Sequence, residues 1–179
     1  MANYTAKFRT NCFRVNDEEA FKDFMKAAGF TLGNKRLWED FGEDGIKRFA
    51  FGSESGAPDE IIDPCFAIIM EHPEFPAFDT EKGYRDMSGF DGESFLEAHG
   101  LEEPDAEDVL PRFYEELRKH VCDGDAAIII EIGNEKLRSV NADAAIVASD
   151  GVTYASFQGI LEKMARSALG NGFRFRFSF

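Results

Sequence analysis

Several features that mark disulfide-bonded and membrane proteins are scarce in this sequence. Its 179 residues include only three cysteines, at positions 12, 65 and 122. None of them form a Cys-x-x-Cys pair, which argues against a disulfide framework and a cysteine-based zinc site. No apolar run approaches the roughly 20 residues that span a bilayer, and the first residues lack the apolar segment of a signal peptide. We therefore expect a soluble, cytoplasmic protein that does not bind membranes.

Motifs for catalysis and cofactor binding are also missing. The chain contains no Gly-x-x-x-x-Gly-Lys or Gly-x-Gly-x-x-Gly phosphate loop, and no Gly-x-Ser-x-Gly nucleophile turn. Cys12 lies within an expected strand and nothing indicates a histidine partner for it, so we expect a buried structural thiol and not a nucleophile. The sequence thus predicts a protein that is not an enzyme, with no catalytic residue and no cofactor.

Metal-binding patterns are weak. The three histidines, His72, His99 and His120, are not clustered in the sequence. Residues 71–74, Glu-His-Pro-Glu, could supply ligands, and Glu97 lies two residues from His99. A solvated loop explains both places equally well. Residues 86–97 resemble a calcium-binding loop only faintly, because they lack the glycine that its sharp turn requires. We predict no metal site from these patterns.

Negative charge is abundant, and it is concentrated in one segment. The formal net charge is −14, from 34 acidic and 20 basic residues. Residues 54–108 hold 17 acidic residues against two basic ones, whereas residues 1–53 carry a balance of +1 and residues 109–179 are neutral. Because phosphate contacts need clustered lysine and arginine, this distribution argues against direct nucleic-acid binding.

The acidic segment also contains five of the six prolines. Proline and glycine interrupt regular elements, so we expect mostly loops and short helices there. Residues 65–70 nevertheless form an apolar run of strand length, and several aromatic residues follow. Phe75, Phe78 and Phe90 lack periodicity, so they either fasten the segment to the domain, which is the simpler interpretation, or serve as exposed anchors for a protein partner. We interpret 54–108 as an acidic, irregular insertion that packs on a single domain formed by residues 1–179.

Periodicity in the flanks predicts an α+β fold with a single, mainly antiparallel sheet and about three helices packed on it. Asn16 is the expected N-cap of the first helix, and Pro111 suits either a helix start or a kink. The continuous apolar run 126–132 is typical of a strand covered on both faces. The expected helices are 17–28, 105–121 and 156–169. The expected strands are 6–15 with a bulge near residues 11–12, 35–41, 46–51, 126–132, 143–149, 152–155 and 173–179. Residues 42–45 and 150–151 are the expected turns of two hairpins.

Two parts of the flanks resemble small acidic proteins carried by bacterial phages, plasmids and conjugative elements. The resemblance rests on residues 9–21, RTNCFRVNDEEAF, and on residues 123–128 and 131–138, DGDAAI and EIGNEKLR. That family is largely uncharacterised, so the resemblance assigns no catalytic or binding residue. It implies a bacterial host cytoplasm and a mobile-element context, in which accessory proteins often inhibit restriction or CRISPR systems and many are acidic DNA mimics.

The leading hypothesis is a non-enzymatic, protein-binding inhibitor of a host nucleic-acid enzyme, of the anti-CRISPR or anti-restriction type. Fifteen excess charges match about 25 Å of duplex DNA at one charge per about 1.7 Å, and such a patch speeds association with a basic partner. The alternatives are an immunity or antitoxin protein that neutralises a basic toxin, a small carboxylate-metal enzyme, and an accessory protein of unknown function. The candidate partner-binding residues combine carboxylates with aromatic anchors: Glu60, Asp63, Glu71, Glu74, Phe75, Phe78, Asp79, Glu81, Asp86, Phe90, Asp91 and Glu93.

Overall fold

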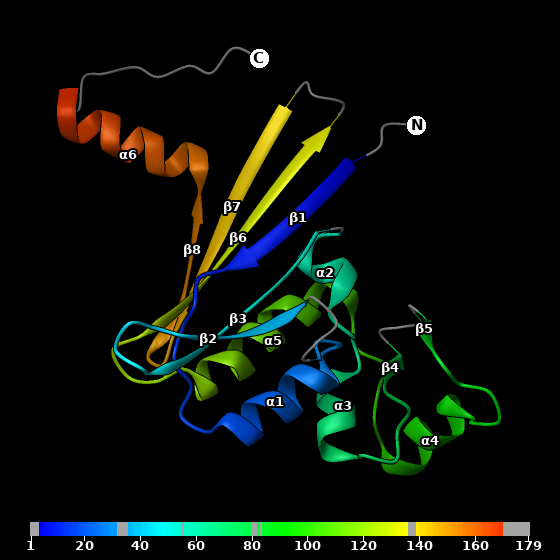
Figure 1. The fold of residues 1–179 in the computed structure, drawn as a ribbon. Coiled ribbons are helices and arrows are strands. Elements are labelled where there is room, and N and C mark those ends of the chain that lie inside the picture. The colour runs from blue at the N-terminus through cyan, green and yellow to red at the C-terminus, as the bar shows by residue number, and fades with distance from the viewer. Residues whose placement is uncertain are drawn as a thin grey trace.

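The computed structural model describes residues 4–31, 36–54, 56–79, 82, 84–135 and 139–169. Within these ranges the chain forms a six-stranded antiparallel sheet, a second sheet of two short strands, and six helices (Figure 1). The α+β class with one main antiparallel sheet is therefore confirmed. No helix in the described part is both long and apolar enough to cross a membrane.

The main sheet has the strand order β2-β3-β1-β6-β7-β8. Two hairpins expected from the sequence are present, β2 to β3 and β7 to β8, and their turns lie at Gly42–Gly45 and Asp150–Gly151. The strand expected at 173–179 lies outside the described residues. The bounds of the strands are β1 Tyr4–Thr10, β2 Leu37–Phe41, β3 Lys47–Ser53, β6 Ala126–Glu135, β7 Ser139–Ala148 and β8 Gly151–Ser156.

A one-residue bulge follows β1, as the sequence predicts. Phe8 pairs with Ser53, whereas Phe13 pairs with Phe49, so the β1 side has one residue more than the β3 side. On the other side of β1, Oδ1 of Asn11 accepts a hydrogen bond from the backbone N–H of Ile128 in β6 at 2.7 Å. The extra residue reverses the alternation, and both Phe8 and Phe13 therefore point into the core.

Helices α1 (Glu18–Ala27) and α5 (Ala106–His120) cover one face of the sheet. Asp17, and not Asn16 as predicted, caps α1, because its carboxylate accepts from the N–H groups of Glu19 and Ala20. Asn16 instead donates its side-chain amide to the carbonyl of Val121 at the end of α5. The bond ties the start of one helix to the end of the other.

Aromatic side chains dominate the core between the sheet and these helices. Phe24 of α1 stacks on Phe113 of α5 with ring centroids 5.1 Å apart, and Phe51 of β3 meets Phe113 edge-on at 5.9 Å. Such pairs add about 0.5–1.5 kcal/mol each beyond the apolar area they bury. The fully buried phenylalanines are Phe13, Phe21, Phe24, Phe30, Phe49, Phe51 and Phe113.

The acidic segment contributes three short helices and the small sheet, β4 (Phe78–Asp79) paired with β5 (Tyr84–Arg85). The helices are α2 (Pro58–Ile61), α3 (Phe66–Glu71) and α4 (Gly92–His99). The apolar run expected to suit a strand is therefore helix α3. Its Phe66 packs against Phe24 and Phe113, because a helix lets this run bury part of its surface on α1 and α5. Figure 1 places α3, α4 and the small sheet together, at the end of the molecule away from α6.

Two further expectations differ from the structure. Pro111 lies inside α5, neither at its first position nor between two helices. Helix α6 (Phe157–Leu169) forms where predicted, but much of its apolar stripe remains exposed. Phe157, Ile160 and Met164 are 54%, 43% and 62% exposed. Figure 1 shows α6 beyond the edge strand β8, away from the helices that cover the sheet.

Candidate functional site

The structure divides the predicted partner-binding residues into surface and interior. Glu60, Glu71, Glu74, Asp86, Asp91 and Glu93 are exposed, whereas Phe78, Asp79 and Phe90 are half-buried. Asp63 and Phe75 are only 2% and 4% exposed. These two residues cannot contact a partner from the inside of the fold, and we remove them from the candidate surface. Glu81 lies outside the described residues.

Asp63 is buried because it holds the insertion together. Its carboxylate accepts hydrogen bonds from the N–H groups of Cys65 (2.9 Å) and Phe78 (3.1 Å) and forms an ion pair with Arg85. Arg85 also donates to the carbonyl of Pro76 at 2.6 Å. Burial raises the pKa of Asp63, against the lowering effect of Arg85 and the two N–H donors. A carboxylate with all these partners organises the loop from within.

Two of the three aromatic residues proposed as anchors, Phe75 and Phe90, belong to an internal cluster with Phe95. Phe75, Phe90 and Phe95 contact one another with ring centroids 5.3–5.5 Å apart. The guanidinium of Arg85 lies 5.0 Å from the centre of the Phe75 ring. Phe75 and Phe90 therefore pack parts of the insertion against one another. Of the two roles that the sequence allowed, fastening the insertion or serving as exposed anchors, this is the first.

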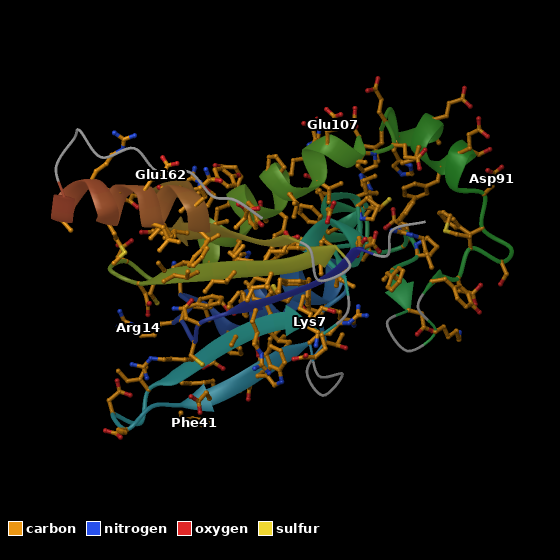
Figure 2. The ribbon with its side chains drawn as sticks, turned by 90° about the horizontal axis from the view of Figure 1, so that it is seen from above. Lys7, Arg14, Phe41, Asp91, Glu107 and Glu162 are labelled. Carbon is orange, nitrogen blue, oxygen red and sulfur yellow. The ribbon has the colours of Figure 1, made fainter. Side chains whose placement is uncertain are left out.

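Most carboxylates of the insertion remain on the surface. Of the 17 acidic residues at 54–108, 14 are exposed, one is half-buried, one is buried and one lies outside the described residues. Figure 2 shows Asp91 and Glu107 among side chains that project outward from α4 and the start of α5. The exposed carboxylates are Glu54, Asp59, Glu60, Glu71, Glu74, Asp86, Asp91, Glu93, Glu97, Glu102, Glu103, Asp105, Glu107 and Asp108.

Few cations of the insertion are available to balance this surface. Lys82 lies 3.1 Å from Asp79 and 3.9 Å from Asp86, and Arg85 is bound to the buried Asp63. Hydrogen bonds from Ser88 lower the pKa of Asp86, and those from Ser94 lower the pKa of Asp91. Both carboxylates consequently stay ionised at any pH near neutrality. We call the exposed carboxylates of residues 59–108 the acidic surface.

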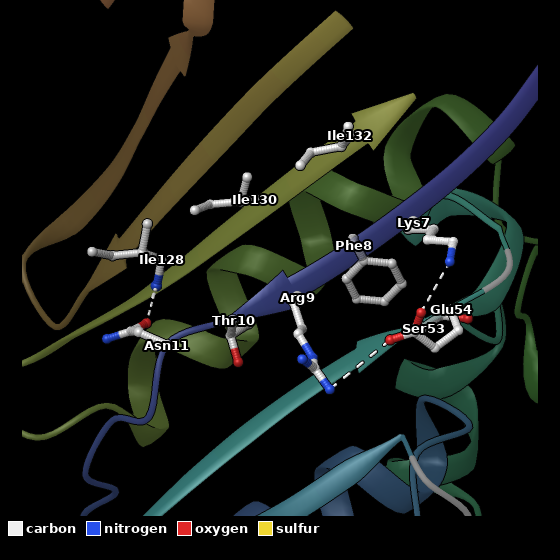
Figure 3. A pocket seen from close by; sticks show the side chains of 10 residues that line it. All are labelled: Lys7, Phe8, Arg9, Thr10, Asn11, Ser53, Glu54, Ile128, Ile130 and Ile132. Atoms are coloured by element: carbon white, nitrogen blue, oxygen red, sulfur yellow. Dashed lines mark hydrogen bonds and ion pairs between the residues drawn. The ribbon is translucent and has the colours of Figure 1, made fainter. Parts of the chain in front are cut away.

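A second candidate site, which the sequence did not predict, lies on the face of the sheet that α1 and α5 leave uncovered. Figure 3 looks onto this face, with the helices behind it. Ile128, Ile130 and Ile132 of β6 form an apolar row in a groove of about 710 Å³. Ile130 and Ile132 are 46% and 52% exposed, whereas the intervening Ile129 is 2% exposed. The apolar run 126–132 is thus covered on one face only, contrary to the prediction.

The polar groups along this groove are already engaged. Lys7 and Arg9 of β1 reach Glu54 at 3.1 and 3.9 Å. The hydroxyl of Thr10 accepts from the N–H of Phe51 at 2.8 Å, and the amide of Asn11 bonds the backbone of β6. Its described lining residues include no histidine or cysteine. The groove therefore suits apolar contact better than acid–base or nucleophilic chemistry.

The sequence did not predict this groove, because the continuous run of isoleucines suggested a strand covered on both faces. Strict alternation of apolar and polar residues would have indicated a strand with one solvent-exposed face, but β6 carries apolar side chains on both faces. The cross-strand pairs do give a usable signal. Lys7 pairs with Ile132 and Arg9 pairs with Ile130, and directly paired residues share a face of the sheet. Two cations beside the isoleucines thus mark that face as solvent-exposed.

Cys12 does not occupy the buried position that we predicted. Its thiol is exposed and lies 3.9 Å from the Asp40 carboxylate. Partial desolvation of the sulfur, together with the adjacent negative charge of Asp40, raises the pKa of Cys12. Because the thiolate is the nucleophile, this environment disfavours reactivity.

The fold brings His99 beside His72 and Glu74, so that three side chains of types that can bind a metal ion lie together. One ligand atom each from His72, Glu74 and His99 lies within 4.8 Å of the other two. His72 immediately follows α3, and His99 is the last residue of α4. The sequence offered residues 71–74 as possible ligands but gave no reason to place His99 beside them.

Comparison with known proteins gives no further guide to this chain. No family model, curated protein or solved structure matches it. The resemblance of the flanks to mobile-element proteins therefore stays a prediction, and the geometry alone must support a function.

Proposed function

We propose that this protein is a non-enzymatic inhibitor that binds a basic protein partner through the acidic surface. The partner is a host nucleic-acid enzyme, a nuclease or another component of a restriction or CRISPR system. The observation that carries the proposal is the imbalance of exposed charge. The acidic surface comprises 13 exposed carboxylates, while Lys82 and Arg85, the two basic residues of the insertion, are paired with carboxylates of the same segment.

The arrangement of the acidic surface supports recognition of a basic groove. Its carboxylates come from α2, α3, α4, the start of α5 and the loops between them. The Asp63–Arg85 pair and the contact of Phe75 with Phe95 order the insertion from within. A preorganised set of charges loses less entropy on binding than a disordered acidic tail does. The charge also steers a basic partner and raises the association rate about 10- to 1000-fold at low salt.

Reversal of exposed charges tests the proposal. We choose Glu71, Glu93, Glu97 and Glu107, all of which are exposed, and replace each with lysine. Bacteria that carry defined restriction or CRISPR systems would express the wild type or this variant, and the plating efficiency of a targeted phage would be measured. We expect the wild type to protect the phage against at least one system and the variant to lose that protection.

A matched variant controls for net charge. Lysine at Asp23, Glu43, Asp123 and Asp143, which are exposed and lie outside the insertion, changes the net charge equally. It should protect the phage as the wild type does, and circular dichroism should show that both variants are folded. Equal protection by both variants, or no protection by the wild type against any system, contradicts the proposal.

A further inference from the structure

We propose that His72, Glu74 and His99 form a binding site for one divalent transition-metal ion, with Zn²⁺ preferred, and that the ion fastens α4 to the end of α3. This inference does not depend on the proposed function. It revises the expectation of no metal site, because the fold supplies a proximity that the sequence spacing did not reveal.

The distances within the group suit tetrahedral coordination. His72 Nδ1 lies 3.5 Å from Glu74 Oε1. In a tetrahedral zinc site with bonds of about 2.0–2.1 Å, neighbouring ligand atoms are about 3.3–3.4 Å apart. The first two ligands are therefore already at the required separation. All three ligand atoms lie within 4.8 Å of one another, so a small side-chain movement of His99 completes the set.

The hydrogen bond made by Nδ1 of His99 leaves its Nε2 available to bind a metal ion. His99 Nδ1 lies 2.9 Å from the carbonyl oxygen of Phe95. Because a carbonyl can only accept, Nδ1 carries the proton, and the neutral ring keeps the lone pair of Nε2 available. A backbone carbonyl that fixes the tautomer and orientation of an imidazole is the usual outer partner of a metal-binding histidine.

The ring of Phe95 packs against both imidazoles and holds them in position. The His99 ring stacks on Phe95 with centroids 4.0 Å apart, and the His72 ring meets Phe95 edge-on at 5.7 Å. Phe95 in turn packs on the buried Phe75. Ligands whose orientation is fixed by packing lose less entropy when they bind an ion.

The donor set selects the class of metal. Two imidazoles and one carboxylate suit zinc and neighbouring transition metals, whereas magnesium and calcium prefer oxygen donors. Three protein ligands leave a fourth position for water or another ligand, as in open zinc sites.

A bound metal ion would stabilise the position of α4, because this helix has no buried residue of its own. Its described anchors are the aromatic contacts of Phe95 and the imidazole pair. An ion held by both His72 and His99 would join two points 27 positions apart in the sequence. It would stabilise the part of the insertion that carries Asp91, Glu93 and Glu97.

Calorimetric titration of the full chain with Zn²⁺ tests the site, with Mg²⁺ as the comparison ion. We expect about one equivalent of Zn²⁺ to bind, and the His99→Gln variant to bind at least about 100-fold more weakly, since even outer partners of a ligand are worth 10–100-fold. Zn²⁺ should also slow amide exchange in residues 92–99 of the wild type and leave that of His99→Gln unchanged.

Two variants separate this site from other donors. Glu97→Gln removes an exposed carboxylate two residues from His99 and should bind Zn²⁺ as the wild type does. Cys12→Ser removes the exposed thiol and should also leave binding unchanged. Absence of Zn²⁺ binding overturns the proposal. So does Zn²⁺ binding that survives His99→Gln, is lost in Cys12→Ser, or is equalled by Mg²⁺.

Discussion

At the scale of single residues, the most consequential side chains of the insertion are those that do not face solvent. Asp63 and Arg85 lie 22 positions apart, and only the fold explains why one of the 16 carboxylates described in this segment is buried. A charge pattern cannot reveal this, because every acidic residue contributes equally to a count. Breaking a buried ion pair typically costs about 3–5 kcal/mol, whereas exposed pairs contribute about 0–1 kcal/mol.

His120 gives this protein a pH-dependent stability. The ring stacks on Phe24 with centroids 5.0 Å apart, and its buried Nε2 has no hydrogen-bond partner among the described residues. Burial lowers the pKa of His120, although Glu116 opposes the shift. The contribution of the neutral ring is therefore complete above about pH 6.5, the unfolded value. It is lost as the pH falls through the lower folded value.

The His120→Phe variant should keep the stacking and remove this titration. We expect the free energy of unfolding of the wild type to fall more than that of the variant between about pH 7.5 and pH 5. Urea unfolding of both proteins at several pH values measures the difference. Parallel pH profiles would show that His120 does not contribute, since the other ionisable groups are common to both proteins.

Local signals decide how well a residue's role can be predicted. Asn16 and Asp17 are both good N-cap residues, and the sequence could not rank them. Which of the two caps the helix depends on Val121, whose carbonyl is distant in sequence and accepts a hydrogen bond from the Asn16 amide. The proximity of His72 and His99 likewise depends on the aromatic cluster around Phe95.

At the scale of elements, periodic patterns predicted α1, α5, α6 and both hairpins well, because each pattern carries its own turn or cap. The run that forms α3 was ambiguous, since six apolar residues suit a strand or a buried helix equally. Strand β6 was recognised, but its environment was not. Whether a strand is covered on one face or two depends on where the helices pack.

Paired substitutions in β6 test the uncovered face. Ile129→Ala removes a side chain that is 2% exposed and should cost about 2–5 kcal/mol. Ile130→Ala removes one that is 46% exposed, so the loss should stay near 1 kcal/mol, the span of β-propensity. Urea denaturation of the two variants measures both costs. Similar costs would mean that the second face is covered in solution.

At the scale of the whole molecule, the acidic segment is continuous with the core and not an appended module. Ile62 and Phe66, which belong to this segment, are 3% and 2% exposed and lie in the same cluster as Phe113. The single domain expected from the sequence is compatible with this packing. Counting charge along the chain identified the segment, but it could not reveal that apolar residues within it complete the core.

Unfolding should therefore be one cooperative transition. Trp38, the single tryptophan, lies on β2 at the far edge of the sheet, so its fluorescence reports on the sheet. Far-UV ellipticity reports on the helices, including those of the insertion. We expect the two signals to give the same urea midpoint. An earlier loss of ellipticity would indicate an insertion that unfolds separately.

The uncovered isoleucine face has a consequence for how molecules of this protein meet one another. Exposed apolar rows such as Ile128, Ile130 and Ile132 favour association of two molecules in water. A net charge of −14 makes the two molecules repel each other. The range of this repulsion shrinks from about 10 Å at 0.1 M salt to about 3 Å at 1 M. The acidic residues thus give the chain colloidal stability, and salt concentration sets how closely two exposed sheets can approach.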